Sequence, residues 1–176
     1  MRWDDLFDDL AARTEHTHRL EREGEVADRI RRDEATVLLA ARVRAATGDL
    51  GLVLRDGSSL NGLVEGVGPD WILVRDATTQ RQVLLPAGAV SAVRDAPRHS
   101  AAPQGAVAAR RTLVLAIRAL ADAGVDVRVR AGSFEVRGTI TRVGADHLDL
   151  VVDRSARGTA AVSVTFANLL SVTEVG

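Results

Sequence analysis

A recurrence at a distance of 76 residues constrains the fold of this chain more than any other feature. The stretch GLVEGVGPDWILV begins at Gly62, and GTITRVGADHLDL begins at Gly138. Both contain glycine, an apolar alternation, Val-Gly and an aspartate in the same order. The match extends upstream, where residues 36–48 align with residues 112–124. A period of this length is typical of a duplicated domain and not of a solenoid. The sequence therefore predicts two equivalent copies.

The alignment of the two copies needs no gap from the helix to the third strand. It places Val53 on Val129 and Asp70 on Asp146. A later hairpin is about three residues longer in the second copy, and after it AVSAV resembles LLSVT. We therefore expect the same order of elements in both copies.

Each copy predicts one helix followed by five short strands. Apolar residues at helical spacing end at Gly48 in the first copy and at Gly124 in the second. Gly62 lies inside the second strand, where glycine indicates a bend or bulge. The predicted strands read LGLVLRDG, SLNGLVEGVG, DWILVRDA, QVLLP and AVSAV, then VDVRVRAG, SFEVRGTITRVG, DHLDLVVD, AAVSVTF and LLSVT.

This pattern of one helix and five bent strands resembles the Sm-like (LSm) barrel. The residues that carry the resemblance are Gly57, Gly62, Val64, Val67 and Asp70 with WILV, and Gly132, Gly138, Ile140, Val143 and Asp146 with HLDLVV. It implies a mainly β chain with helices (α+β), made of two tandem five-stranded barrels that are each preceded by a helix. The opening MRWDDLF also resembles the start of a high-GC bacterial family that is sometimes labelled as transcriptional regulators.

The predicted domain limits follow from the repeat and from the residues between the copies. The segment DAPRHSAAPQG contains proline, glycine and serine, as linkers do. We expect an acidic amphipathic arm over residues 1–22 and the first barrel with its helix over 23–95. The linker then covers 96–105, and the second barrel with its helix covers 106–176.

Composition excludes several classes of protein. The net charge is −1, so no global basic field attracts nucleic acid or anionic membrane. The chain has no cysteine, which excludes disulfides and thiolate metal sites and is typical of the cytoplasm. No apolar run reaches the roughly 18 residues that a membrane helix needs, and the acidic N-terminus differs from a signal peptide. We expect a cytoplasmic protein without a membrane contact.

The N-terminal stretch RWDDLFDDL predicts a helix with one apolar face. Trp3, Leu6, Phe7 and Leu10 have helical spacing, and four aspartates occupy the opposite side. An acidic amphipathic helix of this kind docks into the groove of a protein partner. The alternative is that the four apolar residues pack on the rest of their own chain.

Arginines on the strands of the second copy are the candidate nucleic-acid contacts. Arg128 and Arg130 alternate along one strand and therefore share a face, and Arg137 and Arg142 follow on the next strand. The alternative is a solvated face on which the four arginines pair with acids. The base-binding residues of RNA-binding Sm proteins are missing, because no Asn follows Asp70 and no Arg-Gly pair precedes the last strand.

Catalytic, cofactor and metal sites are not predicted. His16 and His18 are two residues apart, which places them on different sides of a helix, whereas a zinc pair needs a spacing of three or four. His147 follows Asp146 at a turn and corresponds to Trp71 in the first copy, so the repeat does not require histidine there. The recurring Asp70 and Asp146 have the pattern of turn-closing residues.

These observations predict a non-enzymatic module that binds macromolecules. The favoured prediction is an adaptor or assembly module that binds protein, including copies of itself, through the edge strands QVLLP and AVSAV. The alternative is an RNA-binding regulator that uses the arginine face of the second copy.

Overall fold

A computed structural model describes residues 38–102, 104–106, 108–153 and 158–175. The elements of residues 39–94, called the first copy, are α2 (Leu39–Arg44), β1 (Asp49–Leu54), β2 (Ser59–Val67), β3 (Trp71–Asp76), β4 (Gln82–Pro86), η1 (Ala87–Ala89) and β5 (Val90–Arg94). Those of residues 108–174, called the second copy, are η2 (Ala108–Arg110), α3 (Leu113–Asp122), β6 (Asp126–Ala131), β7 (Phe134–Val143), β8 (His147–Asp153), β9 (Thr159–Thr165), η4 (Phe166–Asn168) and β10 (Leu169–Glu174).

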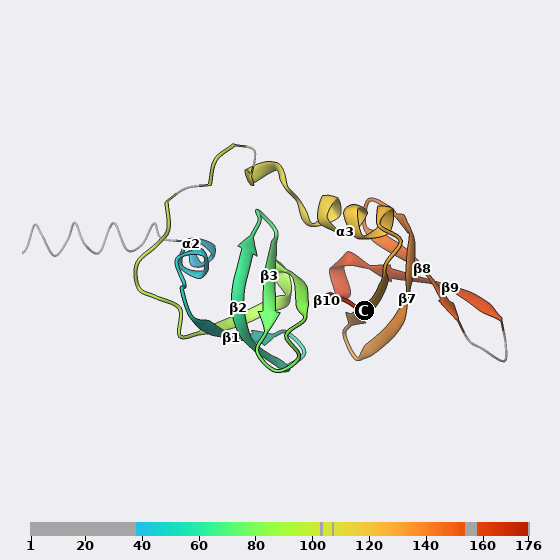
Figure 1. The fold of residues 1–176 in the computed structure, drawn as a ribbon, viewed down its shortest axis with the longest axis horizontal. Helices are drawn as coiled ribbons and strands as arrows, with labels where there is room; N and C mark the ends of the chain where they lie inside the picture. The colour runs from blue at the N-terminus through green and yellow to red at the C-terminus, as the bar shows by residue number, and fades with distance from the viewer. Residues whose placement is uncertain (1–37, 103, 107, 154–157, 176) are drawn as a thin grey trace, which may run out of the picture. The chain divides into compact units, whose positions relative to one another are not determined.

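The ten strands form one antiparallel sheet in the order β5-β1-β2-β3-β4-β10-β6-β7-β8-β9 (Figure 1). The prediction of two separate five-stranded Sm-like barrels is therefore wrong. Each copy does place its last strand beside its first, but β4 pairs with β10 of the other copy, with Val172 opposite Leu84. The outer strands β5 and β9 pair on one side only, so the sheet stays open. The described residues contain two α-helices, and α2 has only six residues.

The alignment of the first strands also needs a correction. Val129 occupies the place of Leu52, not of Val53, because Val129 pairs with Val136 as Leu52 pairs with Leu60. Leu52 and Val129 are both fully buried, whereas Val53 is half-buried. Because buried and exposed positions alternate along a strand, burial sets the register of this strand, and that register differs from the one given by the local sequence match. The turn that follows is one residue shorter in the second copy, which restores the shift of 76.

The second strand of each copy contains a bulge as predicted, but the bulge lies beyond Gly62 and Gly138 and not at them. The pairing register shifts between Val64 and Gly66, and again between Ile140 and Arg142, so both strands contain a bulge. A Cβ on Gly62 would overlap the carbonyl oxygen of Arg75 on the neighbouring strand. Only glycine allows so close an approach of two backbones.

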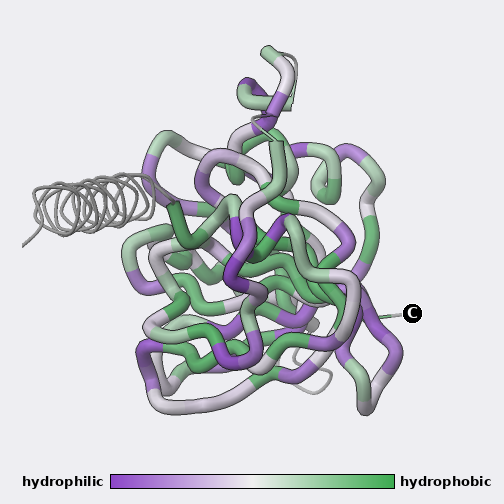
Figure 2. The backbone as a smooth tube through the Cα atoms, turned by 90° about the vertical axis from the view of Figure 1, so that its left-hand side faces the viewer, coloured by the Kyte–Doolittle hydropathy of each residue, from purple (hydrophilic) through white to green (hydrophobic). Residues whose placement is uncertain are grey.

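Two apolar cores lie along the sheet, and each contains a residue of the other copy. Leu170 from β10 is fully buried in the core of the first copy, with Leu52, Val74 and Leu85. Leu84 from β4 is buried in the core of the second copy, with Ile117 and others. Figure 2 shows hydrophobic segments gathered along the inner strands and hydrophilic segments in the outer turns. The two copies are therefore stabilised together.

Candidate functional site

The junction of β4 and β10 is the first candidate site, because both copies contribute to it. Leu73 and Leu84 stand opposite each other on β3 and β4, and both pack against the core of the second copy. Trp71 packs there as well. A small cavity of about 200 Å³ remains between these residues, α3 and β10. This face of the first copy is an apolar surface that holds the second copy.

Polar side chains of the first copy also bind the backbone of the second. The Asp70 carboxylate accepts a hydrogen bond from the Leu113 amide at the start of α3, at 2.7 Å. The Trp71 indole donates to the carbonyl of Arg111, at 2.6 Å. Carboxylates favour the first turn of a helix, where amides lack partners. Asp70 was predicted to close a turn, and the structure gives its side chain this contact with a helix start.

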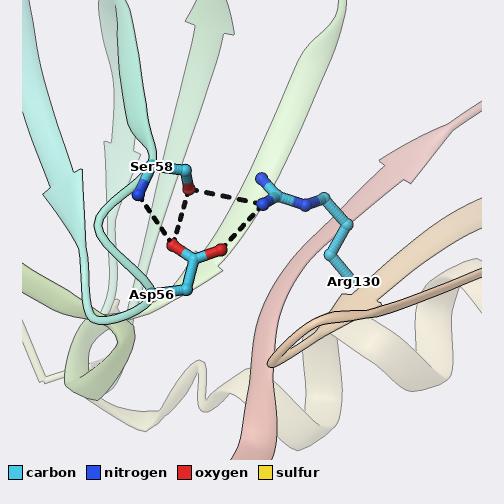
Figure 3. Close-up of polar contacts among 3 residues, drawn as sticks. All are labelled: Asp56, Ser58 and Arg130. Carbon is cyan, nitrogen blue, oxygen red and sulfur yellow. Dashed lines mark hydrogen bonds and ion pairs between the residues drawn. The ribbon is translucent and has the colours of Figure 1, made fainter.

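A second polar contact crosses the junction at the turn between β1 and β2 (Figure 3). The Arg130 guanidinium donates to Asp56 at 2.8 Å and to the Ser58 hydroxyl at 3.3 Å. The Ser58 hydroxyl and amide both donate to Asp56, at 2.7 and 3.0 Å. These Ser58 hydrogen bonds lower the pKa of Asp56 below its ordinary value of 3.8, and the charge of Arg130 lowers it by a smaller amount.

We expect Asp56→Asn to lower the free energy of unfolding by about 1 kcal/mol at neutral pH, since the ion pair is partly screened by solvent. A lowered pKa in the folded state stabilises the fold above the unfolded pKa, and this contribution is lost as the pH falls through the folded value. The difference from wild type should therefore begin to shrink near the ordinary pKa of 3.8 and disappear below the lower folded value. Urea unfolding at a series of pH values measures it.

Arg130→Gln is the matched variant for this prediction. It removes the charge but leaves both Ser58 hydrogen bonds, which are the main cause of the lowered pKa. The variant should therefore keep most of the pH dependence that Asp56→Asn loses. Equal loss in both variants would show that the charge of Arg130 dominates instead.

Three of the four predicted arginines line one polar hollow of about 790 Å³ at the junction. Arg128, Arg130 and Arg137 lie there together with Arg81 from the first copy. Arg142 is exposed on β7 and does not line this hollow. Arg81 was not among the predicted arginines, because its place beside the second copy depends on the pairing of β4 with β10.

The arginines of this hollow have acidic or carbonyl partners. Arg128 lies 3.6 Å from Glu135, and Arg137 lies 3.4 Å from Asp126. Arg81 donates to the carbonyl of Glu174 at 3.3 Å. Exposed pairs of this kind contribute little stability, but they reduce the positive field that a nucleic acid would meet. The contacts match the solvated, paired alternative better than a free basic face.

The free edge of β9 is the second candidate site. Thr159–Thr165 contains no charged residue and no proline, which are the usual means of protecting an edge strand. The Phe166 amide donates to the carbonyl of Asp146. Hydrogen-bonded pairs alternate along an antiparallel ladder, so the amides of Ala161 and Ser163 point away from β8. The opposite edge, β5, ends in Arg94.

A polar cluster lies beside this edge on β8 and β9. The His147 ring contacts the Asp146 carboxylate at 2.8 Å, and its other nitrogen lies 3.9 Å from Asp149. The Ser163 hydroxyl donates to Asp149 at 2.6 Å. The hydrogen bond with His147 lowers the pKa of Asp146. The cluster lacks the order of a catalytic triad, because the serine donates to a carboxylate and not to the histidine.

The remaining predictions concern the N-terminal arm, metal binding and membrane contact. The arm residues Trp3, Leu6, Phe7 and Leu10 lie outside the described residues. Within the described ranges, no group of three or more His, Asp or Glu side chains has an arrangement that could hold a metal ion. None of the helices in the same ranges combines the length and apolar character needed to cross a membrane.

No family model matches the chain, and no curated protein is significantly similar to it.

Proposed function

We propose that the chain is a cytoplasmic, non-enzymatic protein-interaction module that binds an extended segment of another protein at the edge of β9. The observation that carries this proposal is the unprotected edge itself, which has seven residues and neither charge nor proline. In β-strand addition, main-chain hydrogen bonds supply affinity and the side chains on either face supply specificity. The amides of Ala161 and Ser163 are two of the donors available for such a strand.

The face beside the edge indicates what the bound segment would carry. Asp149, Ser163 and His147 are polar and partly engaged with one another. An apolar segment laid over them would bury these groups without new partners, at a cost of about 1 to 3 kcal/mol for each group left unsatisfied. A segment with hydroxyl, amide or basic side chains would instead hydrogen-bond with them.

Binding of RNA at the arginine hollow is less well supported. The hollow does bring four arginines together, but their contacts with Asp56, Asp126 and Glu135 reduce the field. None of the described side chains that line the hollow is aromatic, whereas single-stranded nucleic acids are usually held by aromatic stacking.

Site-specific photo-crosslinking in cells tests the proposal. A photoreactive residue at Thr165, exposed on β9, should give a discrete protein adduct. The same residue at Ala92, exposed on β5, is the matched control and should give none. The adduct is identified by mass spectrometry, and the purified partner segment is then titrated. Ala161→Pro removes one outward amide and should weaken binding about tenfold, the value of one hydrogen bond.

Two results would contradict the proposal. Absence of a protein adduct at Thr165, or a partner that binds Ala161→Pro as tightly as wild type, would exclude β9 as the site. An RNA adduct from a photoreactive residue at Arg128, with none at Thr165, would favour the RNA-binding alternative.

A further inference from the structure

The two copies have equivalent strand pairs, so the surfaces that meet at the junction can be compared with those at the two outer edges. In the first copy Leu73 stands opposite Leu84, and in the second Asp149 stands opposite Ser163. Equivalent residues of β4 and β9 therefore differ by 79 in number. The hydrogen bonds after these strands give the same difference, because the amides of Ala87 and Phe166 donate to the carbonyls of Asp70 and Asp146. The outer face of β9 is therefore the counterpart of the face that holds the second copy.

Polar groups replace the apolar groups of the junction at this outer face. The first copy uses Leu73 and Leu84 to pack against the core of the second copy. The second copy has Asp149 and Ser163 in the same places, hydrogen-bonded to each other at 2.6 Å. His147 similarly replaces Trp71. Covering this face with another copy in the same geometry would bury a carboxylate and an imidazole where the junction buries leucines and an indole, which is unfavourable.

The opposite outer edge shows the matching change. Leu170 is the bulged residue of β10, between Leu169 and Ser171, and it is fully buried in the core of the first copy. The bulge of β5 falls between Val90 and Ala92 and therefore places Ser91 in the same position. Ser91 is exposed. If β5 paired with another copy as β10 pairs with β4, the hydroxyl of Ser91 would take the place that the side chain of Leu170 fills at the junction. The smaller side chain would leave a cavity in the core there.

We infer that the two outer edges of the sheet do not bind further copies of this chain. Ser91, Asp149 and Ser163 prevent the contact seen at the junction from forming between chains, so that it forms only between the two copies within one chain. The inference concerns the chain's own copies and is independent of the proposed partner at β9. It replaces the prediction of self-association through QVLLP and AVSAV, which form β4 and β5, because only β5 lies at an edge of the sheet.

Two half-variants test this inference. Asp149→Leu with Ser163→Leu restores the leucines of the β9 side, and Ser91→Leu restores the leucine of the β5 side. Each half-variant alone lacks the complementary surface and should stay monomeric. Mixed in equal amounts, they should form a complex with the mass of two chains, measured by sedimentation velocity. The chain that carries all three substitutions should form longer head-to-tail oligomers as its concentration rises.

The mixture distinguishes a specific junction from aggregation through exposed leucines. Association of either half-variant with itself, as strong as that of the mixture, would overturn the inference, as would a mixture of folded half-variants that stays monomeric. The wild-type chain gives a second test that needs no variant. It should sediment as a monomer, with the amides of β5 that point away from β1, and those of Ala161 and Ser163, open to hydrogen exchange. A wild-type oligomer that protects these amides would also overturn the inference.

Discussion

Leu170→Ala is expected to lower the free energy of unfolding by about 3 kcal/mol, as large buried side chains do when they are truncated in a core that cannot collapse. Leu170 is fully buried, and it belongs to the core of the first copy although it comes from β10. Loss of its side chain therefore leaves a cavity at the place where the two copies meet. Urea denaturation followed by circular dichroism measures the change.

Ser91→Ala is the matched control for this substitution. Ser91 holds the equivalent position on β5, but it is exposed, so its truncation should change stability by less than about 0.5 kcal/mol. Because the cores contain residues of both copies, Leu170→Ala should shift a single unfolding transition. A loss below about 1 kcal/mol, or two separate transitions in the wild-type chain, would contradict this view of the junction.

Gly62→Ala is expected to destabilise the fold by about 3 kcal/mol, at the upper end of what overpacking usually costs. The added Cβ would overlap the backbone carbonyl oxygen of Arg75. A backbone atom of a paired strand cannot turn aside as a side chain can. The pairing of β2 with β3 must therefore open locally, and thermal denaturation should show a clearly lower midpoint.

Gly88→Ala provides the control in the same copy. No atom lies within 4 Å of a Cβ built on Gly88, and its backbone does not require glycine. This variant should melt with the wild type or slightly above it, because alanine restricts the unfolded chain. Equal behaviour of the two variants would show that the approach of β3 to Gly62 does not constrain the strand.

Only part of the arginine hollow could be predicted from the sequence. Alternation along β6 placed Arg128 and Arg130 on one face, and the hollow contains both. Arg81 lines the same hollow from the other copy, and Asp56 of that copy pairs with Arg130, each more than 40 residues away in sequence. No local pattern indicates such neighbours, because they depend on which strands pair across the junction.

The polar cluster on β8 and β9 carried a partial signal. The difference between His147 and Trp71 was visible in the alignment of the copies. The difference between Asp149 and Leu73 lies in the same ungapped stretch. The difference between Ser163 and Leu84 appears only when the longer hairpin is placed correctly. The strand register supplies that placement, because it shows which residues stand opposite each other.

Local patterns predicted the duplication, the strand positions and the presence of a bulge in the second strand of each copy, because apolar alternation and glycine act over a few residues. They did not predict that the strands form one open sheet and not two barrels, which is a property of the tertiary structure. That outcome depends on Leu84 and Leu170, each of which is buried in the core of the other copy. The burial of these two leucines stabilises the fold through contacts between residues far apart in the chain, which local patterns do not contain.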